Sequence, residues 1–425
     1  MPSTSPPLPR LAYVTSTYPA ASHTFILREI TALEALGFQI LPCAIREPAP
    51  DNLIGPEEVA AHARTFYVLK AARRLPTLPL ALLAALARPG RFLRTLALAL
   101  RTAPPGARGL LKQSFYLAEA LILTRHLRAR QIAHIHNHFS DHSANVSMLT
   151  SALSGIPFSY TLHGPNEFYE AHKWYFAEKT ARAEFVACIS HFARSQAMYF
   201  SDPVHWDKLR IVHCGVVPDR YDQPHDAPQD DQAGTRLLFV GRLTPVKGVR
   251  LLLEALERTH AIRDDITLDI IGDGEDRAHL EALAAPLGSR VRFLGYRSQA
   301  EVAAALAKAD ILVLPSFAEG LPVVLMEALA AATPVICSQL AGVAELVEDG
   351  QSGFLIPAGD VATLADRILT LAADPERRER MGRHGQAQVR TQFDIRVEAA
   401  RIGRLFADGP GAAVRPVPLA PDTSG

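Results

Sequence analysis

Apolar runs typical of strands alternate with segments of helical periodicity from close to the start of this chain. Residues 11–14 predict a strand, the apolar positions of 25–36 lie largely on one side of a helix that stops at Gly37, and residues 39–45 predict a second strand. Strand, helix and strand in this order are typical of a doubly wound parallel sheet. Further strand candidates follow near residues 132–133, 158–161, 185–187 and 211–212. The first half of the chain is therefore predicted to be one α/β domain.

The alternation restarts after a break at residues 219–234, which are rich in Asp, Gln, Pro and Gly and show no periodicity. Such a composition is typical of an exposed linker between domains. Strand candidates then lie at 236–240, 266–271, 291–294, 311–314 and 335–337. Helix candidates lie at 249–260, 275–287, 299–307, 322–331, 360–373 and 375–393.

The predicted fold is therefore α/β, with two Rossmann-like, doubly wound parallel-sheet domains, 1–218 and 235–393, that face each other across a cleft. The chain length agrees with two domains, because a single hydrophobic core stops growing at roughly 250–300 residues and this chain has 425. Residues 394–408 predict a closing helix that can pack back on the first domain. Residues 409–425 have no pattern and predict a disordered tail.

Charge and cysteine usage narrow the functional classes. Lys plus Arg and Asp plus Glu each number 44, so the formal net charge is zero and a nucleic-acid partner is not expected. The four cysteines lie far apart without a C-x-x-C spacing, which favours free thiols in a reducing compartment. No signal peptide and no stretch long enough to span a membrane is visible. A cytoplasmic protein is expected.

The segment 60–117 contains Arg and Lys but neither Asp nor Glu, and Leu and Ala fill the gaps between its basic residues. A basic amphipathic stretch of this kind can rest peripherally on the anionic inner face of a cell membrane. The alternative is a pair of solvated helices that cover the first sheet, because charge runs usually form solvent faces. The sequence leaves both interpretations open.

Two glutamates flank a Gly-Leu-Pro turn after the strand candidate 311–314. Glu319 precedes Gly320, Leu321, Pro322 and Val323, and Glu327 follows eight residues after the first glutamate. Proline suits the first turn of a helix, so the amides from Gly320 onward should form an exposed, positive helix end. Open α/β sheets bind ligands at the carboxyl ends of their strands. This site can hold sugar hydroxyls, and Glu327 suits a ribose diol.

A second motif follows the strand candidate 236–240 and contains Gly241, Arg242 and Lys247. The two cations precede a helix, where phosphates commonly bind. Placed over a diphosphate, they would stabilise it as a leaving group.

The strings G-R-L-x-x-x-K-G, I-G-D-G (271–274), E-G-L-P-x-x-x-x-E and G-F-L (353–355) together resemble family-four retaining glycosyltransferases of the GT-B fold. The likeness covers 236–393. The first half is similar through S-x-T-F-I-L-R-E-I (22–30) and T-L-H-G (161–164), and the first of these strings resembles enzymes of exopolysaccharide assembly, such as those for colanic acid.

The resemblance implies a sugar transfer from a UDP- or GDP-sugar to a glycan or lipid-linked acceptor, with retained anomeric configuration and without a metal. It implies that Glu319 and the amides of 320–323 hold the donor sugar, Arg242 and Lys247 its diphosphate, and Glu327 its ribose. His163 would face the sugar across the cleft. Bond formation would occur on the face that the leaving group departs from, with the phosphate taking the acceptor proton.

The chain departs from the family pattern on the acceptor side. Relatives usually carry an acidic residue two positions after the His-Gly pair, whereas this chain has Asn166 followed by Glu167. The first loop, 17–23, lacks the paired glycines of many relatives. Ser22, Thr24, His138 and Asn166 are the acceptor-side candidates.

Alternating histidines at 134, 136 and 138 would share one face of a strand, and three converging imidazoles can bind zinc. Relatives carry a similar string without a metal, so no metal is predicted. Two other functions remain open: a sugar-nucleotide epimerase on the same fold, and a catalytically idle scaffold that binds a sugar nucleotide.

Overall fold

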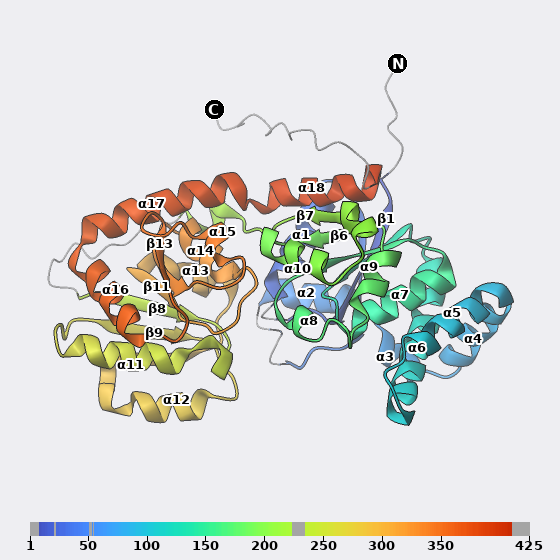
Figure 1. Ribbon diagram of the computed structural model, residues 1–425, viewed down its shortest axis with the longest axis horizontal. Helices are drawn as coiled ribbons and strands as arrows, with labels where there is room; N and C mark the ends of the chain where they lie inside the picture. The colour runs from blue at the N-terminus through green and yellow to red at the C-terminus, as the bar shows by residue number, and fades with distance from the viewer. Residues whose placement is uncertain (1–7, 21–22, 51–52, 54, 223–233, 410–425) are drawn as a thin grey trace, which may run out of the picture.

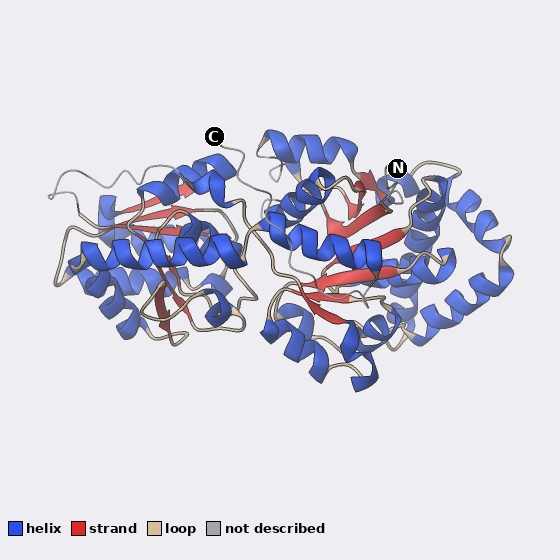
Figure 2. Cartoon of the chain, turned by 90° about the horizontal axis from the view of Figure 1, so that it is seen from above, coloured by secondary structure: helices blue, strands red, loops and turns tan. Residues whose placement is uncertain are grey.

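The computed structural model describes residues 8–20, 23–50, 53, 55–222 and 234–409. Within them the chain forms two parallel sheets, each covered by helices on both faces (Figures 1 and 2). The two-domain α/β prediction is confirmed. Ser22, most of the linker 219–234 and all but the first residue of the tail 409–425 lie outside the described residues.

The first sheet has the strand order β3-β2-β1-β4-β5-β6-β7, and all its pairings are parallel. Its strands are β1 (Arg10–Thr17), β2 (Gln39–Arg46), β3 (Phe66–Tyr67), β4 (His134–His138), β5 (Phe158–Leu162), β6 (Val186–Cys188) and β7 (Leu209–Ile211). Its flanking helices are α1 (Thr24–Ala35), α2 (Pro56–Arg64), α7 (His142–Ser154), α8 (Asn166–Tyr169), α9 (Phe176–Arg182), α10 (His191–Tyr199) and the 3-10 turn η3 (Pro203–Lys208).

The second sheet has the order β10-β9-β8-β11-β12-β13, again parallel throughout. Its strands are β8 (Arg236–Val240), β9 (Thr267–Ile271), β10 (Val291–Gly295), β11 (Ile311–Leu314), β12 (Val335–Ser338) and β13 (Gly353–Ile356). Its helices are α11 (Val249–His260), α12 (Arg277–Ala284), α13 (Gln299–Lys308), α14 (Val323–Ala330), α15 (Val343–Leu346) and α16 (Val361–Ala373). Short 3-10 turns are η4 (Pro218–Tyr221), η5 (Pro245–Lys247) and η6 (Ala285–Arg290).

Two helices at the end of the described chain run along both domains (Figure 1). Helix α17 (Pro375–Gln392) lies on the second domain against α14, and α18 (Ile395–Asp408) lies on the first domain against α1. The buried face of α18 places Ala399, Ile402 and Phe406 in one apolar cluster with Leu11 and Tyr13 of β1. The chain thus crosses twice between the domains.

The strand expected near residues 132–133 lies slightly later, at His134–His138. All five of its residues are buried, although three are histidines. Burial is tolerated because the imidazoles find partners on the next strand: His134 Nε2 and His136 Nδ1 lie 2.7 and 2.8 Å from Ser159 Oγ. Sequence periodicity alone underrates such a strand, because it counts polar residues against burial.

The basic segment is not a pair of helices covering the sheet. After α2 it forms α3 (Val68–Ala72), α4 (Thr77–Leu86), α5 (Pro89–Arg101) and the long α6 (Ala107–Ala129). Helices α4, α5 and α6 pack on one another and form the end of the molecule farthest from the second domain (Figure 1). No described helix is long and apolar enough to cross a bilayer.

Candidate active site

A cavity of about 780 Å³ lies between the two domains, with residues of both in its wall. Most of the predicted site residues meet there: Thr24, His163, Asn166, Gly241, Arg242, Lys247, Glu319, Gly320, Leu321, Pro322, Val323 and Glu327. They come from loops and helix starts at the carboxyl ends of strands, where parallel sheets converge on a ligand. His138 does not line the cavity and is fully buried behind it.

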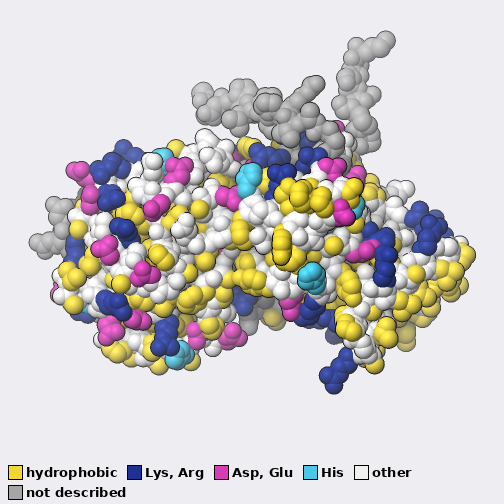
Figure 3. All heavy atoms as spheres, viewed as in Figure 1, with side chains coloured by type: hydrophobic (Ala, Val, Ile, Leu, Met, Phe, Trp, Pro, Cys, Tyr) yellow, Lys and Arg dark blue, Asp and Glu magenta, His cyan; other side chains and the backbone are white. Residues whose placement is uncertain are grey.

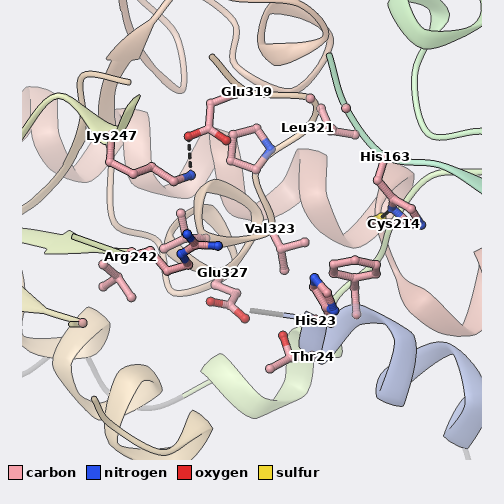
Figure 4. A pocket seen from close by; sticks show the side chains of 18 of the residues that line it. His23, Thr24, His163, Cys214, Arg242, Lys247, Glu319, Leu321, Val323 and Glu327 are labelled. Carbon is pink, nitrogen blue, oxygen red and sulfur yellow. Dashed lines mark hydrogen bonds and ion pairs between the residues drawn. The ribbon is translucent and has the colours of Figure 1, made fainter. Parts of the chain in front are cut away.

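Lys247 and Glu319 face each other on the second-domain wall (Figure 4). Lys247 Nζ lies 2.6 Å from Glu319 Oε1, and Ser316 Oγ donates to the same oxygen at 2.6 Å. Their loops approach closely because Gly248 has φ +67°, and a Cβ there would meet the carbonyl oxygen of Pro315 at 2.0 Å. Arg242 has no ion-pair partner among the described residues, so its guanidinium is available to an anion.

Helix α14 begins beside this pair. Pro322 is the residue that precedes the helix, with an extended backbone (ψ 120°), and the first helical residue is Val323. The expectation of proline in the first helical turn was therefore wrong by one position. Residues 320–324 still line the cavity, and the first N–H groups of a helix have no acceptor within the helix.

His163 forms the opposite wall, where its ring lies 4.6 Å from the ring centroids of both Phe25 and Phe139. Its Nε2 lies 2.9 Å from His138 Nδ1, and its Nδ1 lies 3.6 Å from Cys214 Sγ. Burial lowers the pKa of His163 well below its ordinary value, so the ring is neutral at neutral pH. Both ring nitrogens have protein partners, and the histidine therefore meets the cavity with its ring and backbone.

The acidic residue that follows the His-Gly pair has a structural task. Glu167 is buried, and its carboxylate accepts the backbone N–H groups of Ser140, His163 (2.6 Å) and Gly164 (3.0 Å). Burial raises the pKa of this carboxyl to about 7. Asn166 is exposed at the rim of the cavity. Glu167 thus fixes the loop, and Asn166 is the exposed polar residue at the rim.

Sequence reasoning missed the partner of Glu327. Arg28 of α1 reaches across from the first domain, and its Nη2 lies 2.5 Å from Glu327 Oε1. Both side chains are buried, with 4% and 11% of their surface exposed. The only signal in the sequence is the basic residue inside the S-x-T-F-I-L-R-E-I string.

One group among the described residues has the spacing of a metal site: Glu29, His136 and His138. However, both nitrogens of His136 are engaged, by Ser159 at 2.8 Å and Thr161 at 2.9 Å. Glu29 accepts a hydrogen bond from the Tyr13 hydroxyl at 2.7 Å. Protein partners therefore occupy two of the three side chains, whereas His138 Nε2 is buried without a hydrogen-bond partner among the described residues and lies 3.5 Å from Glu29 Oε1.

Comparison with known families identifies the chain. Residues 24–220 match the family described as Glycosyltransferase Family 4, and residues 223–388 match Glycosyl transferases group 1. The chain belongs to the family-four glycosyltransferases. The two matches meet at the linker, so each covers one of the two domains.

Among similar curated proteins, the amylovoran biosynthesis glycosyltransferase AmsK of Erwinia amylovora is 26% identical over 93% of this chain and 99% of its own length. A phosphatidyl-myo-inositol mannosyltransferase of Mycobacterium leprae is 39% identical over 41% of this chain, and the match spans 46% of that protein. The second likeness therefore concerns about half of the relative.

Solved structures share the fold. HepE of Anabaena in complex with UDP-glucose superposes with a TM-score of 0.71 at 19% identity, over 94% of this chain and all of that chain. The sucrose-phosphate synthase of Thermosynechococcus elongatus gives a TM-score of 0.71 at 19% identity, over 94% and 98%. Both likenesses support the GT-B architecture.

Proposed function

We propose that this glycosyltransferase moves a sugar from a nucleoside-diphosphate sugar to a glycan or lipid-linked acceptor, with retention at the anomeric carbon and without a metal. The observation that carries the proposal is the pairing of Lys247 with Glu319 at 2.6 Å in the cavity between the domains. A cation and a carboxylate beside free helix amides suit a diphosphate and a sugar hydroxyl together.

The proposed roles follow from where the groups lie. Arg242 and Lys247 bind the diphosphate and stabilise the charge that develops as it leaves, which replaces a metal ion in that task. Glu319 and the amides of 320–323 hold the sugar, and Glu327 holds the ribose. His163 is held neutral with both ring nitrogens bonded, so we assign it to positioning the sugar. The phosphate oxygen takes the acceptor proton.

The second domain would bind the donor and the first the acceptor, with Thr24, Asn166 and Ser22 on the acceptor side and His138 supporting His163 from behind. The donor would be a UDP- or GDP-sugar. HepE is a structural neighbour with UDP-glucose bound, and AmsK is named for the synthesis of amylovoran. These likenesses favour cell-surface or exopolysaccharide synthesis as the process.

A nucleotide-sugar screen tests this function. We expect one UDP- or GDP-hexose to raise the melting temperature, because a ligand at 100 times its Kd stabilises the folded state by about 2.7 kcal/mol. With glycan and lipid-linked acceptors, nucleoside diphosphate should be released and the product should keep the donor's anomeric configuration by NMR. Interconversion of the sugar without an acceptor would identify an epimerase instead. Binding without turnover on any acceptor would identify a scaffold.

We also propose that the protein is cytoplasmic and that helices α4, α5 and α6 rest on the anionic inner face of the cell membrane. Half of the strongly exposed large hydrophobic side chains of the described residues lie between Leu75 and Phe115. They are Leu75, Leu78, Leu80, Leu82, Leu83, Leu86, Leu93, Leu100, Leu110, Leu111 and Phe115. Figure 3 shows hydrophobic side chains with Lys and Arg beside them at this end of the molecule.

Segment 60–117 itself carries charge of one sign. All basic residues of 60–117 are exposed. Arg64, Lys70 and Arg101 pair with carboxylates outside the segment, and the other basic residues have no carboxylate partner among the described residues. Exposed leucines can insert at the acyl boundary of an anionic bilayer, and the cations between them can contact its headgroups.

Vesicle sedimentation checks the membrane proposal. The chain should bind vesicles with 30% phosphatidylglycerol and lose most of that binding in pure phosphatidylcholine, because each basic residue near the surface contributes about 1 kcal/mol. Leu83→Asp with Leu93→Asp should abolish binding while the melting temperature is kept, since both residues are exposed. Tyr199→Asp, an exposed site on α10, is the control. Equal sedimentation of wild type and double variant would refute the assignment.

A further inference from the structure

A buried ion pair joins the two domains beside the cavity. Arg28 Nη2 lies 2.5 Å from Glu327 Oε1, 3.0 Å from Gln299 Oε1 and 3.4 Å from the hydroxyl of Tyr221. Arg28 belongs to α1 of the first domain, Gln299 and Glu327 to α13 and α14 of the second, and Tyr221 to the connection between them. One guanidinium therefore contacts three elements that only the domain arrangement brings together.

Burying this ion pair costs free energy, because both charged groups lose their contact with water. Taking a carboxylate and a guanidinium out of water is unfavourable, and a buried ion pair seldom adds net stability. Here the Arg28 Nε and Nη1 atoms are buried without a partner among the described residues, so the desolvation is only partly repaid. A role in ligand binding explains such an unfavourable arrangement better than a role in stabilising the fold.

The carboxylate keeps room for a second partner. Arg28 engages Oε1 of Glu327, and the Tyr221 hydroxyl also hydrogen-bonds this carboxylate. A carboxylate has about four acceptor positions on its two oxygens, so positions remain for a ligand. Glu327 also lines the cavity, whereas Arg28 does not. In Figure 4 the carboxylate of Glu327 lies on the same side of the cavity as Thr24, at the start of α1. Arg28 thus approaches the glutamate from behind and leaves its cavity side open.

We infer that Arg28 is a positioning residue for donor binding: from the acceptor-side domain it holds the Glu327 carboxylate in the orientation that accepts the two ribose hydroxyls. The inference rests on the proposed function, since it assumes a nucleotide in the cavity. The inference also couples the two domains, because Arg28 of the first domain fixes the orientation of the carboxylate of Glu327 in the second. A domain arrangement that withdraws α1 would weaken nucleotide binding.

Calorimetric titration with two nucleotides and their ribose-modified analogues tests the inference. Wild type, Arg28→Lys and Arg28→Gln are titrated with UDP, with GDP, and with the analogue of each that lacks both ribose hydroxyls. In wild type we expect loss of the hydroxyls to weaken binding about tenfold or more, since buried acceptors reject a ligand that cannot donate to them. In Arg28→Gln this discrimination should shrink to about twofold, and in Arg28→Lys it should be intermediate.

Arg220→Gln is the matched control. Arg220 also spans the domain border, pairing with Glu57 at 2.8 Å and lying 3.4 Å from Gln299 Oε1, but its side chain is 43% exposed. We expect it to keep the wild-type discrimination. Melting curves identify any variant that does not fold. If Arg28→Gln does not fold, the comparison of wild type with Arg28→Lys tests the inference.

The outcomes separate the two proposals. If wild type binds neither nucleotide, the proposed function fails and the inference fails with it. If wild type binds and both Arg28 variants weaken UDP and its ribose-modified analogue equally, the proposed function stands, Arg28 serves only the fold, and the inference is refuted.

Discussion

Replacing Lys247 by Ala is expected to lower kcat by about 10²–10³-fold, the loss that follows removal of one preorganised group at a developing anion. The ammonium lies 2.6 Å from Glu319 and is 23% exposed, so it is close enough to the cavity to meet a ligand. Without it, charge on the departing diphosphate rests on Arg242 and the helix amides alone. The donor KM should change less than kcat, because the largest charge develops in the transition state.

Steady-state assays of nucleoside diphosphate release measure this effect. Lys173→Ala is the matched control: its Nζ lies at the same 2.6 Å from a glutamate, Glu170, but the pair is about half exposed. Removing an exposed pair of this kind changes stability little, and turnover should stay at the wild-type level. A Lys247→Ala enzyme with unchanged kcat would contradict the leaving-group role.

Replacing Gly320 by Ala is expected to lower kcat/KM by about 100-fold with little change in melting temperature. A Cβ at this position would lie 2.0 Å from the carbonyl oxygen of His163 and 2.9 Å from the Cα of Gly164. Both atoms belong to the backbone of the opposite domain, so they cannot rotate away. The domains would have to separate slightly, and a misplacement near 1 Å can cost about 100-fold in rate.

The same assay with thermal melting checks this result. Gly90→Ala on α5 is the control, because the nearest atom to its Cβ would be the flexible end of Arg94 at 3.8 Å. Loss of activity together with a melting temperature lowered by many degrees would point to a folding defect instead of domain separation. Full activity of Gly320→Ala would show that the contact between His163 and Gly320 is not needed for turnover.

Much of the site could be predicted because it depends on local order along the chain. Lys247 and Glu319 each follow a strand of one parallel sheet, and the carboxyl ends of adjacent parallel strands meet at one edge. β8 and β11 are such neighbours. The residues after them must therefore approach each other, whatever the details of packing.

The sequence by itself determined the two α/β domains, and it predicted a break near 219–234 and the residues of the donor-side loops. It also marked 60–117 as basic and free of acids. These features are encoded in periodicity, turn residues and spacing, which act over a few residues at a time.

Tertiary structure alone decided which groups meet across the domain border. Periodicity indicates that Arg28 lies on a helix and Glu327 on another, but their contact spans 299 positions of the chain and depends on how two domains pack. The same holds for His138, which lies behind His163, and for Glu167, whose carboxylate is taken by backbone amides. A buried charge or imidazole needs a hydrogen-bonding or ionic partner. When that partner is distant in sequence, the packing of the domains decides which residue it is, and local sequence patterns do not show this.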